Sequence, residues 1–220
     1  MTVSMIGRRR PSLTLATLAA LGGLVLTPAL GKGQTVSGTG AAATVNAAGT
    51  VQRFASATLP ADGGMSNADL TAATLPNMLS ANGLTSIATG QIDQALVSAT
   101  TSAEAMDVSI LNGLITAKAV VALATSYANG VTATSESDGS TLLELVVNGV
   151  SYGDATPPPN TRLNLPGVGY AVVNEQIPTG DGVRSTGLTV NMIHVYLIDP
   201  LSGATTANIV VATAQTAASR

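Results

Sequence analysis

The sequence contains no cysteine, no tryptophan and one histidine among its 220 residues, and only 10% of its side chains are charged. Without cysteine the chain cannot form a disulfide framework, a thiolate metal site or a cysteine nucleophile. Charged residues make up about 25% of an average domain, so this composition excludes a charge-driven nucleic-acid binder, a coiled coil and an acidic disordered tail. The chain that remains is aliphatic, with 45% hydrophobic and 2% aromatic residues.

The amino terminus has the layout of a signal peptide. Three arginines at residues 8–10 precede an apolar run over residues 13–26, which is the order that export signals use. Pro28 ends the run, and small residues lead to a cleavage site after Gly31. We therefore predict that residues 1–31 form a cleaved signal helix and that the mature chain is secreted, extracellular or associated with the cell surface.

Two alternatives concern this segment. An uncleaved membrane anchor needs about 20 apolar residues, and Gly22, Gly23 and Pro28 interrupt the run, which favours cleavage. A twin-arginine export route fits the adjacent arginines, although Ser12 stands where that signal prefers a large apolar residue. The choice between the two export routes stays open, and no membrane contact is expected after cleavage.

The mature chain is acidic. Cleavage removes three of the nine lysines and arginines and none of the twelve carboxylates, so the formal net charge changes from −3 to −6. Between residues 54 and 161, nine carboxylates accompany a single cation, Lys118. Such a field repels phosphate backbones, so we expect no nucleic-acid partner.

Residues 32–84 are predicted to be a small-residue extension with a turn and a short helix. Residues 34–59 alternate Gly, Ala, Thr, Ser and Val, which favours a strand or an ordered extension over a helix. Residues 60–64 (Pro-Ala-Asp-Gly-Gly) form a turn signal. Residues 66–82 are the best helical candidate because their Ser-Asn-Ala-Asp start resembles a helix cap, and Pro76 limits this helix to one or two turns.

From residue 85 onward, short segments of alternating apolar and polar residues predict strands. Turn signals spaced about 8 to 15 residues apart are typical of sandwiches, barrels and solenoids. The predicted strands are residues 85–88, 95–102, 105–111, 114–127, 141–147, 162–165, 170–176, 187–198 and 208–215. The turn signals are Asn112-Gly113, Asn129-Gly130, Asp138-Gly139, Asn148-Gly149, Gly180-Asp181-Gly182 and Ser202-Gly203.

The predicted fold is therefore all-β, with an antiparallel β-sandwich-like domain over residues 85–220 that packs with the extension as one unit. The alternative is a β-solenoid or roll. In residues 188–198 one face is apolar from Leu188 to Met192, and the other face turns apolar from Ile193 onward. We expect this strand to be half-buried at its start and covered on both faces at its end.

Residues that carry chemistry are few. The lone His194 cannot supply a histidine metal cluster, and no calcium-loop pattern is present, so no metal and no cofactor are expected. No Gly-x-Ser-x-Gly elbow accompanies the histidine. The Gly-x-Gly at residues 167–169 lacks the third glycine and the strand-to-helix context of a dinucleotide loop.

One polar cluster is nevertheless a candidate site. Glu175 lies among apolar residues of a predicted strand, where a buried acid needs a partner. His194, Arg162 and backbone amides are candidate partners, and Asn174 adjoins the acid. A structural hydrogen bond is one interpretation. The other is an exported hydrolase that uses Glu175 with His194, or with a second carboxylate such as Glu144.

An ordered series of five motifs runs through the second half of the chain: VSILNGLITA at 108–117, LVVNG at 145–149, PNTR at 159–162 with LPGVG at 165–169, VNEQ at 173–176, and LTVNMIHV at 188–195. Over roughly residues 85–214 this series resembles the choice-of-anchor P family of secreted actinobacterial proteins. The resemblance implies a secreted or cell-surface β-rich domain, and it carries no activity, cofactor or partner. Anchored members have an attachment signal that is not visible in this chain.

These observations predict a noncatalytic protein with a structural or adhesive role in the bacterial envelope, with cell-wall components or other surface proteins as partners. Two alternatives stay open. One is the exported hydrolase. The other is a self-assembling surface subunit, in which an exposed strand edge accepts residues 34–59 of a neighbouring copy by strand addition and homo-oligomers form.

Overall fold

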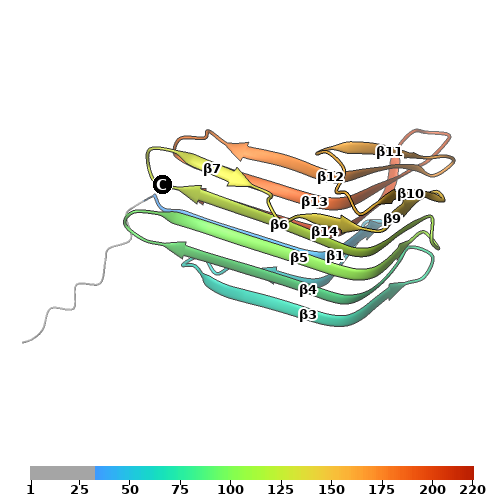
Figure 1. The fold of residues 1–220 in the computed structure, drawn as a ribbon, viewed down its shortest axis with the longest axis horizontal. Helices are drawn as coiled ribbons and strands as arrows, with labels where there is room; N and C mark the ends of the chain where they lie inside the picture. The colour runs from blue at the N-terminus through green and yellow to red at the C-terminus, as the bar shows by residue number, and fades with distance from the viewer. Residues whose placement is uncertain (1–32) are drawn as a thin grey trace, which may run out of the picture.

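The computed structural model describes residues 33–220, and the predicted signal helix lies outside these described residues. Residues 33–220 form fourteen β-strands and no helix, so this part of the chain contains no helical segment that could cross a membrane. The strands form two antiparallel sheets that pack face to face (Figure 1). The predicted all-β, antiparallel sandwich-like fold is confirmed, and the two packed sheets exclude the solenoid alternative.

Sheet A contains β1 (Thr35–Ala47), β2 (Thr50–Thr58), β11 (Thr161–Leu165), β12 (Gly169–Gly180), β13 (Ser185–Ile198) and β14 (Thr205–Ser219). Their order is β11-β12-β13-β14-β1-β2. The first and last strands of the described chain therefore pair with each other inside the sheet. Residues 34–59, predicted as an extension, are strands β1 and β2 of this sheet.

Sheet B contains β3 (Gly64–Leu75), β4 (Leu79–Ile92), β5 (Val97–Ile110), β6 (Ile115–Ala128), β7 (Ala133–Glu136), β8 (Thr141–Leu143), β9 (Leu145–Val147) and β10 (Val150–Gly153). The long strands β3 to β6 follow one another as a meander. The short strands β7, β8 and β9 pair in turn along β6, and β10 pairs with β9.

The predicted short helix in residues 66–82 is wrong. Residues up to Leu75 belong to β3, and residues from Leu79 onward belong to β4. Pro76 lies in the turn between them, next to Asn77 with a φ of 62°. The weak helical signal does not produce a helix because β3 pairs with β4 along its whole length. Tertiary pairing of this kind overrides local propensity.

All long strands bend at the same position along their length, so the whole sandwich is bent near one end (Figure 1). A left-handed backbone conformation costs an alanine about 1 kcal/mol, so the packing of the bend must hold it in place. Residues with positive φ at this level are Ala55, Asn174 and Ala212 in sheet A and Gly83, Asp107 and Glu144 in sheet B.

The bend exchanges the inner and outer faces of each long strand. In β13, Val190 and Met192 are fully buried, and the next inward residues are Ile193 and Val195. The inward parity thus changes from even to odd between Met192 and Ile193. The prediction that the end of this strand is covered on both faces is therefore wrong, because its later even-numbered residues, including His194, lie on the outer face and remain partly exposed.

The sheets approach each other closely at the end away from the bend. A Cβ on Gly38 would lie 2.7 Å from Thr101 Oγ1, and a Cβ on Gly40 would collide with Ser86. Besides glycine, alanine, serine and threonine, this region contains the buried side chains of Val36, Leu59 and Val97. A chain of hydroxyl contacts at 2.7 to 2.8 Å connects the sheets through Thr186, Ser135, Ser126 and Thr216.

Candidate functional site

The Glu175 cluster, formed by Glu175, Asn191, His194, Tyr196 and Thr213, lies on the outer face of sheet A. Glu175 Oε2 accepts a hydrogen bond from Asn191 Nδ2 at 2.7 Å and lies 2.8 Å from His194 Nδ1. The Tyr196 hydroxyl donates to Glu175 Oε1 at 3.1 Å and lies 2.9 Å from the same His194 nitrogen. Thr213 donates to Asn191 Oδ1 at 2.9 Å. The cluster therefore ties β12, β13 and β14 together.

The bend brings this cluster together. Strict alternation along β13 would place Asn191 and His194 on opposite faces of the sheet. At the bend, Asn174 of β12 has a φ of 51°, and Met192 of β13 is fully buried. Both strands exchange their faces at these residues, so that Glu175, Asn191 and His194 share one outer face.

Aromatic stacking extends the cluster to β11. The Tyr196 ring stacks on His194, with centroids 4.0 Å apart, and on Tyr170, with centroids 4.7 Å apart. The Arg162 guanidinium lies 3.8 Å from the centroid of Tyr170, a cation–π contact. Arg162 is thus linked to Glu175 through two tyrosine rings and does not contact the carboxylate as an ion-pair partner.

Asn174 lies apart from the Glu175 cluster. Its side chain is buried and donates to the carbonyl oxygen of Pro157 at 2.9 Å. Gln176 donates to Asn174 Oδ1 at 3.0 Å, and the backbone N–H of Asn160 donates to the Asn174 carbonyl at 2.8 Å. Asn174 therefore holds the loop that leads into β11.

The charges in the Glu175 cluster are set by burial and hydrogen bonding. The side chains of Glu175 and His194 are only 13% and 14% exposed. Burial acts to raise the pKa of Glu175, but hydrogen bonds from His194, Asn191 and Tyr196 together outweigh it and lower the pKa below its ordinary value. Burial and the neighbouring Glu175 carboxylate raise the pKa of Tyr196 to about 12. At neutral pH, Glu175 is therefore an ionised acceptor and Tyr196 a neutral donor.

Both ring nitrogens of His194 are enclosed by the protein. Nδ1 contacts Glu175 and Tyr196, and Nε2 is buried without a hydrogen-bond partner. A general base must lie within hydrogen-bond reach of the proton that it removes. In this arrangement a substrate proton reaches neither nitrogen, and the geometry is that of an internal hydrogen-bond network.

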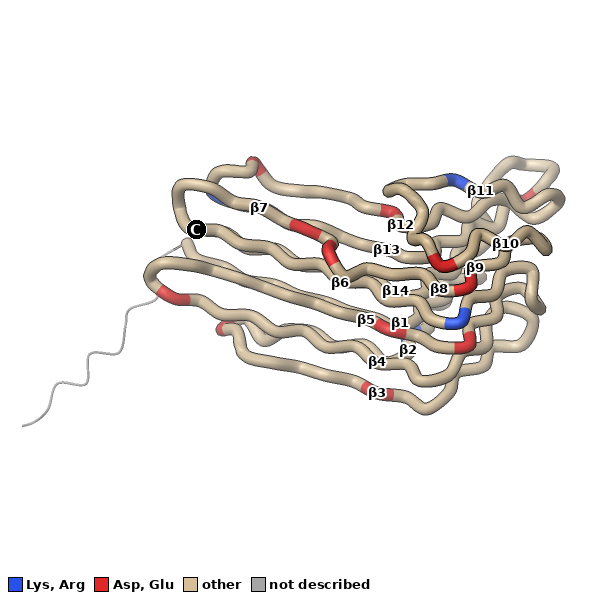
Figure 2. Tube along the Cα trace, in the orientation of Figure 1, with Lys and Arg blue, Asp and Glu red and all other residues tan. Residues whose placement is uncertain are grey.

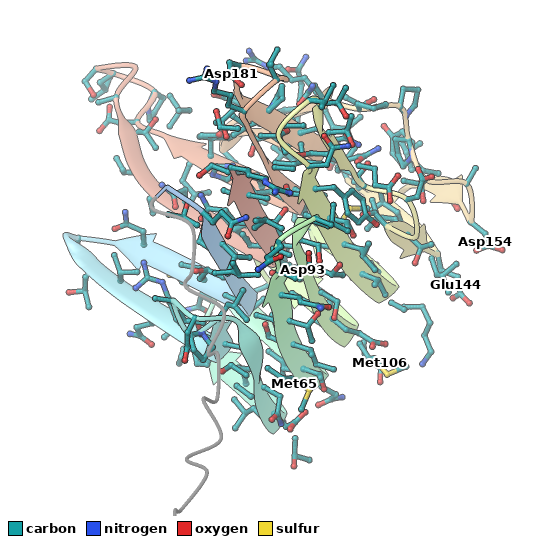
Figure 3. The ribbon with its side chains drawn as sticks, turned by 90° about the vertical axis from the view of Figure 1, so that its left-hand side faces the viewer. Met65, Asp93, Met106, Glu144, Asp154 and Asp181 are labelled. Atoms are coloured by element: carbon teal, nitrogen blue, oxygen red, sulfur yellow. The ribbon has the colours of Figure 1, made fainter. Side chains whose placement is uncertain are left out.

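A second polar group lies on sheet B. Lys118 Nζ lies 2.5 Å from Asp107 Oδ1 in an exposed ion pair, and the hydrogen bond from Lys118 lowers the pKa of Asp107. This pair and Glu144 line an open groove of about 520 Å³. Glu144 projects from sheet B beside Asp154 (Figure 3), so the two carboxylates Glu144 and Glu175 belong to different sheets.

The sequence pointed to Asn191 beside Glu175 and His194, but not to Tyr196, Tyr170 or Thr213 as members of the site. One signal was present: His194 and Tyr196 are two positions apart in a predicted strand, so they share a face. The contact of Tyr170 with Tyr196 needs the register of β12 against β13. This register is a long-range property that strand patterns do not contain.

Asp181 closes the β12–β13 hairpin at the end away from the bend (Figure 3). Its Oδ1 accepts hydrogen bonds from the backbone N–H groups of Ser185, Val183 and Arg184 at 2.8 to 2.9 Å. These hydrogen bonds lower the pKa of Asp181 to about 2. They form with the ionised carboxylate and hold the turn between β12 and β13 together.

The carboxyl of Asp181 is therefore expected to titrate with a midpoint of about 2 in an NMR pH titration of the folded protein. Its ordinary value is about 3.9. Because the folded-state pKa is the lower one, its contribution to stability is present above about pH 4 and is lost as the pH falls through about 2. Asp181→Asn should abolish this titration, and a midpoint near 4 in the unsubstituted protein would show that the hairpin hydrogen bonds do not form in solution.

In residues 33–220 no three His, Asp or Glu side chains are arranged to hold a metal ion. The chain matches no protein-family model, no curated protein and no solved structure. The geometry described above is therefore the basis for a functional proposal.

Proposed function

We propose that this chain is an exported, noncatalytic β-sandwich protein with a structural or adhesive role in the bacterial envelope. Its partners in this role are cell-wall components or other surface proteins, which meet strand faces and strand edges of the sandwich. The resemblance to the choice-of-anchor P family supports the same assignment.

The observation that carries the proposal is the enclosed state of His194. Nε2 is buried, and Nδ1 contacts Glu175 and Tyr196. Glu175 and His194 are thus engaged in a contact between the neighbouring strands β12 and β13. Hydrogen bonds from Glu175 to side chains of the neighbouring strand β13 tie the strands together on the outer face of sheet A.

The start of the folded body supports export. Strand β1 begins at Thr35, just beyond the predicted cleavage site after Gly31. Cleavage there would remove no residue of either sheet. The sparse charge of the sandwich, in which acidic residues are scattered and cations are few (Figure 2), also fits a body that contacts neutral polymers or proteins rather than nucleic acid.

Fractionation of bacterial cells that express the full chain tests the proposal. We expect the protein in the medium or the wall fraction, with a mature amino terminus at Lys32 in mass spectrometry. Leu18→Arg places a charge in the apolar run of the signal and should retain the chain in the cytosol as a matched control. An unsubstituted protein confined to the cytosol would contradict export.

The hydrolase remains a second candidate because Glu175 and His194 lie 2.8 Å apart, as a carboxylate and an imidazole do in a catalytic triad. In that function Glu175 would orient the ring and His194 would act as the base. The buried Nε2 would first have to become accessible. The pairing of Glu175 with Glu144 has no comparable support, because the two carboxylates belong to different sheets.

A further inference from the structure

The Glu175 cluster contains two groups that can react with each other. Thr213 on β14 carries a hydroxyl, which is a nucleophile, and Asn191 on β13 carries a carboxamide. The two residues are direct partners in the ladder between these strands, beside the bend. The Thr213 hydroxyl donates a hydrogen bond of 2.9 Å to Asn191 Oδ1. A nucleophile and an acyl group are therefore held in contact within one chain.

The carboxylate of Glu175 fixes the orientation of the Asn191 amide. An ionised carboxylate only accepts hydrogen bonds, so the amide nitrogen faces it, and Asn191 Nδ2 donates to Glu175 Oε2 at 2.7 Å. The carbonyl side of the amide then faces Thr213. Asn191 is only 7% exposed, and its contact with Thr213 is partly buried. The hydroxyl of Thr213 is thus closer to the amide than bulk water is.

Glu175 is also placed to assist the departure of the amide nitrogen. This nitrogen leaves as ammonia only after it gains a proton, and a positioned side chain can supply one. Glu175 Oε2 lies 2.7 Å from Asn191 Nδ2 and 2.8 Å from His194 Nδ1, so it connects the ring to the departing nitrogen. The buried Nε2 of His194 keeps these groups away from an external substrate. They are nevertheless in contact with an internal one.

We propose that Thr213 and Asn191 form an intramolecular ester, which joins β13 and β14 covalently. The bond from Thr213 Oγ1 to Asn191 Cγ forms, and the bond from Cγ to Nδ2 breaks. Nδ2 takes up a proton relayed through Glu175, and the proton that Thr213 loses replaces it in the hydrogen-bond network. The products are the ester and ammonia, so the reaction needs no oxidant, reductant or cofactor.

Proximity favours this exchange of an amide for an ester. For well-oriented groups within one molecule, effective concentrations reach about 10⁵ to 10⁸ M, and the ammonia is lost to the solvent. Each chain reacts once, so the ester is a cross-link and not an enzymatic turnover. In a chain without cysteine, it ties two neighbouring strands as a disulfide does in other proteins. The reaction needs only the folded chain and does not depend on the envelope role.

A second threonine–amide pair in the same ladder provides an internal comparison. Thr189 of β13 is the partner of Gln215 of β14, two positions along each strand from the proposed ester. On β12 the residue beside Thr189 is Ile177, whereas Glu175 stands beside Asn191. Thr189 and Gln215 therefore lack the neighbouring carboxylate that orients the amide and relays the proton. We expect this second pair to stay unlinked.

Intact-mass spectrometry tests the proposal on protein purified from whichever cell fraction holds it. Attack by the threonine expels ammonia, so the mass should lie about 17 Da below that of the sequence. Asp199 lies in the loop between β13 and β14. Digestion of the denatured protein at Asp199 separates Asn191 from Thr213 unless the ester joins them. We expect the lower mass, and we expect these two peptides to remain joined.

Three variants assign the reaction to its groups. Thr213→Val removes the nucleophile with little change of shape and should restore the full mass of its sequence. Glu175→Gln keeps the nucleophile and the amide but removes the relay, and it should also keep its full mass. Thr189→Val is the matched control on the same face and should retain the loss of ammonia. Circular dichroism confirms that each variant folds, and stabilities compared in a Thr213→Val background separate the hydrogen bonds of the Glu175 cluster from the ester.

Three results would overturn the ester. One is an unsubstituted protein at the full mass of its sequence. Another is a loss of ammonia that survives Thr213→Val, because the backbone and not the hydroxyl would then attack Asn191. The third is conversion of Asn191 to an aspartate, which would identify water as the attacking group. Failure of export, in contrast, would affect only the proposed function.

Discussion

Glu175→Gln is expected to lower the free energy of unfolding by about 2 kcal/mol, the cost of leaving half-buried polar groups without partners. In the native cluster both carboxylate oxygens accept hydrogen bonds from side chains of β13. Glutamine has nearly the same shape but replaces one acceptor oxygen by an amide N–H₂ group. That group would face either the Asn191 amide, where one donor would meet another donor, or the Tyr196 hydroxyl, which would have to give up its hydrogen bond to the side chain at position 175 in order to accept.

Urea denaturation of the purified variants measures this effect. Glu144→Gln is the matched control, since it makes the same chemical change at an exposed position on sheet B. Surface substitutions of this kind change stability by about 0.5 kcal/mol or less. If Glu175→Gln proved as stable as the unsubstituted protein, or more stable, the Glu175 cluster would not stabilise the sandwich. The hydrolase would then become the better proposal, because catalytic groups are often held at the expense of stability.

Ile193→Ala is expected to destabilise the fold by about 2–5 kcal/mol, the range for truncating a buried aliphatic side chain. Ile193 is fully buried in the core between the sheets. It is the first inward residue after the bend in β13, so its burial depends on the exchange of faces at Met192. Without that exchange, His194 would point inward and Ile193 would lie on the surface.

Ile177→Ala on the neighbouring strand β12 is the matched control for Ile193→Ala. Its side chain is 47% exposed on the outer face, so the same truncation should cost well under 2 kcal/mol. Urea denaturation curves of the two variants give both values. Equal losses, or a larger loss for Ile177→Ala, would contradict the change of inward parity at the bend.

The strands and hairpins of the second half follow from local sequence signals. Asn148-Gly149 joins β9 and β10 with positive φ at both residues, as the preference of Asn-Gly for a tight hairpin turn predicts. The alternation in residues 187–198 identifies β13 to within a few residues. Period and turn chemistry are local properties, which explains why they can be recognised without the structure.

The bend could not be predicted. Ala55 and Ala212 adopt positive φ at this level, and alanine carries no signal for a conformation that it disfavours. Packing between the sheets imposes this conformation. The bend decides which residues share the outer face, so the assembly of the Glu175 cluster could not be predicted either. Glu175 and His194 were nevertheless each identifiable as polar residues in apolar strands.

The double-mutant cycle of Glu175→Gln and His194→Gln tests the central claim most directly, since that claim is that these two residues stabilise the sandwich through each other. For residues in one hydrogen-bond network, urea denaturation should give a coupling energy of about 1–2 kcal/mol, so that the second substitution costs much less once the first is made. Additive losses, with a coupling energy below about 0.5 kcal/mol, would mean that Glu175 and His194 act independently and would contradict this account.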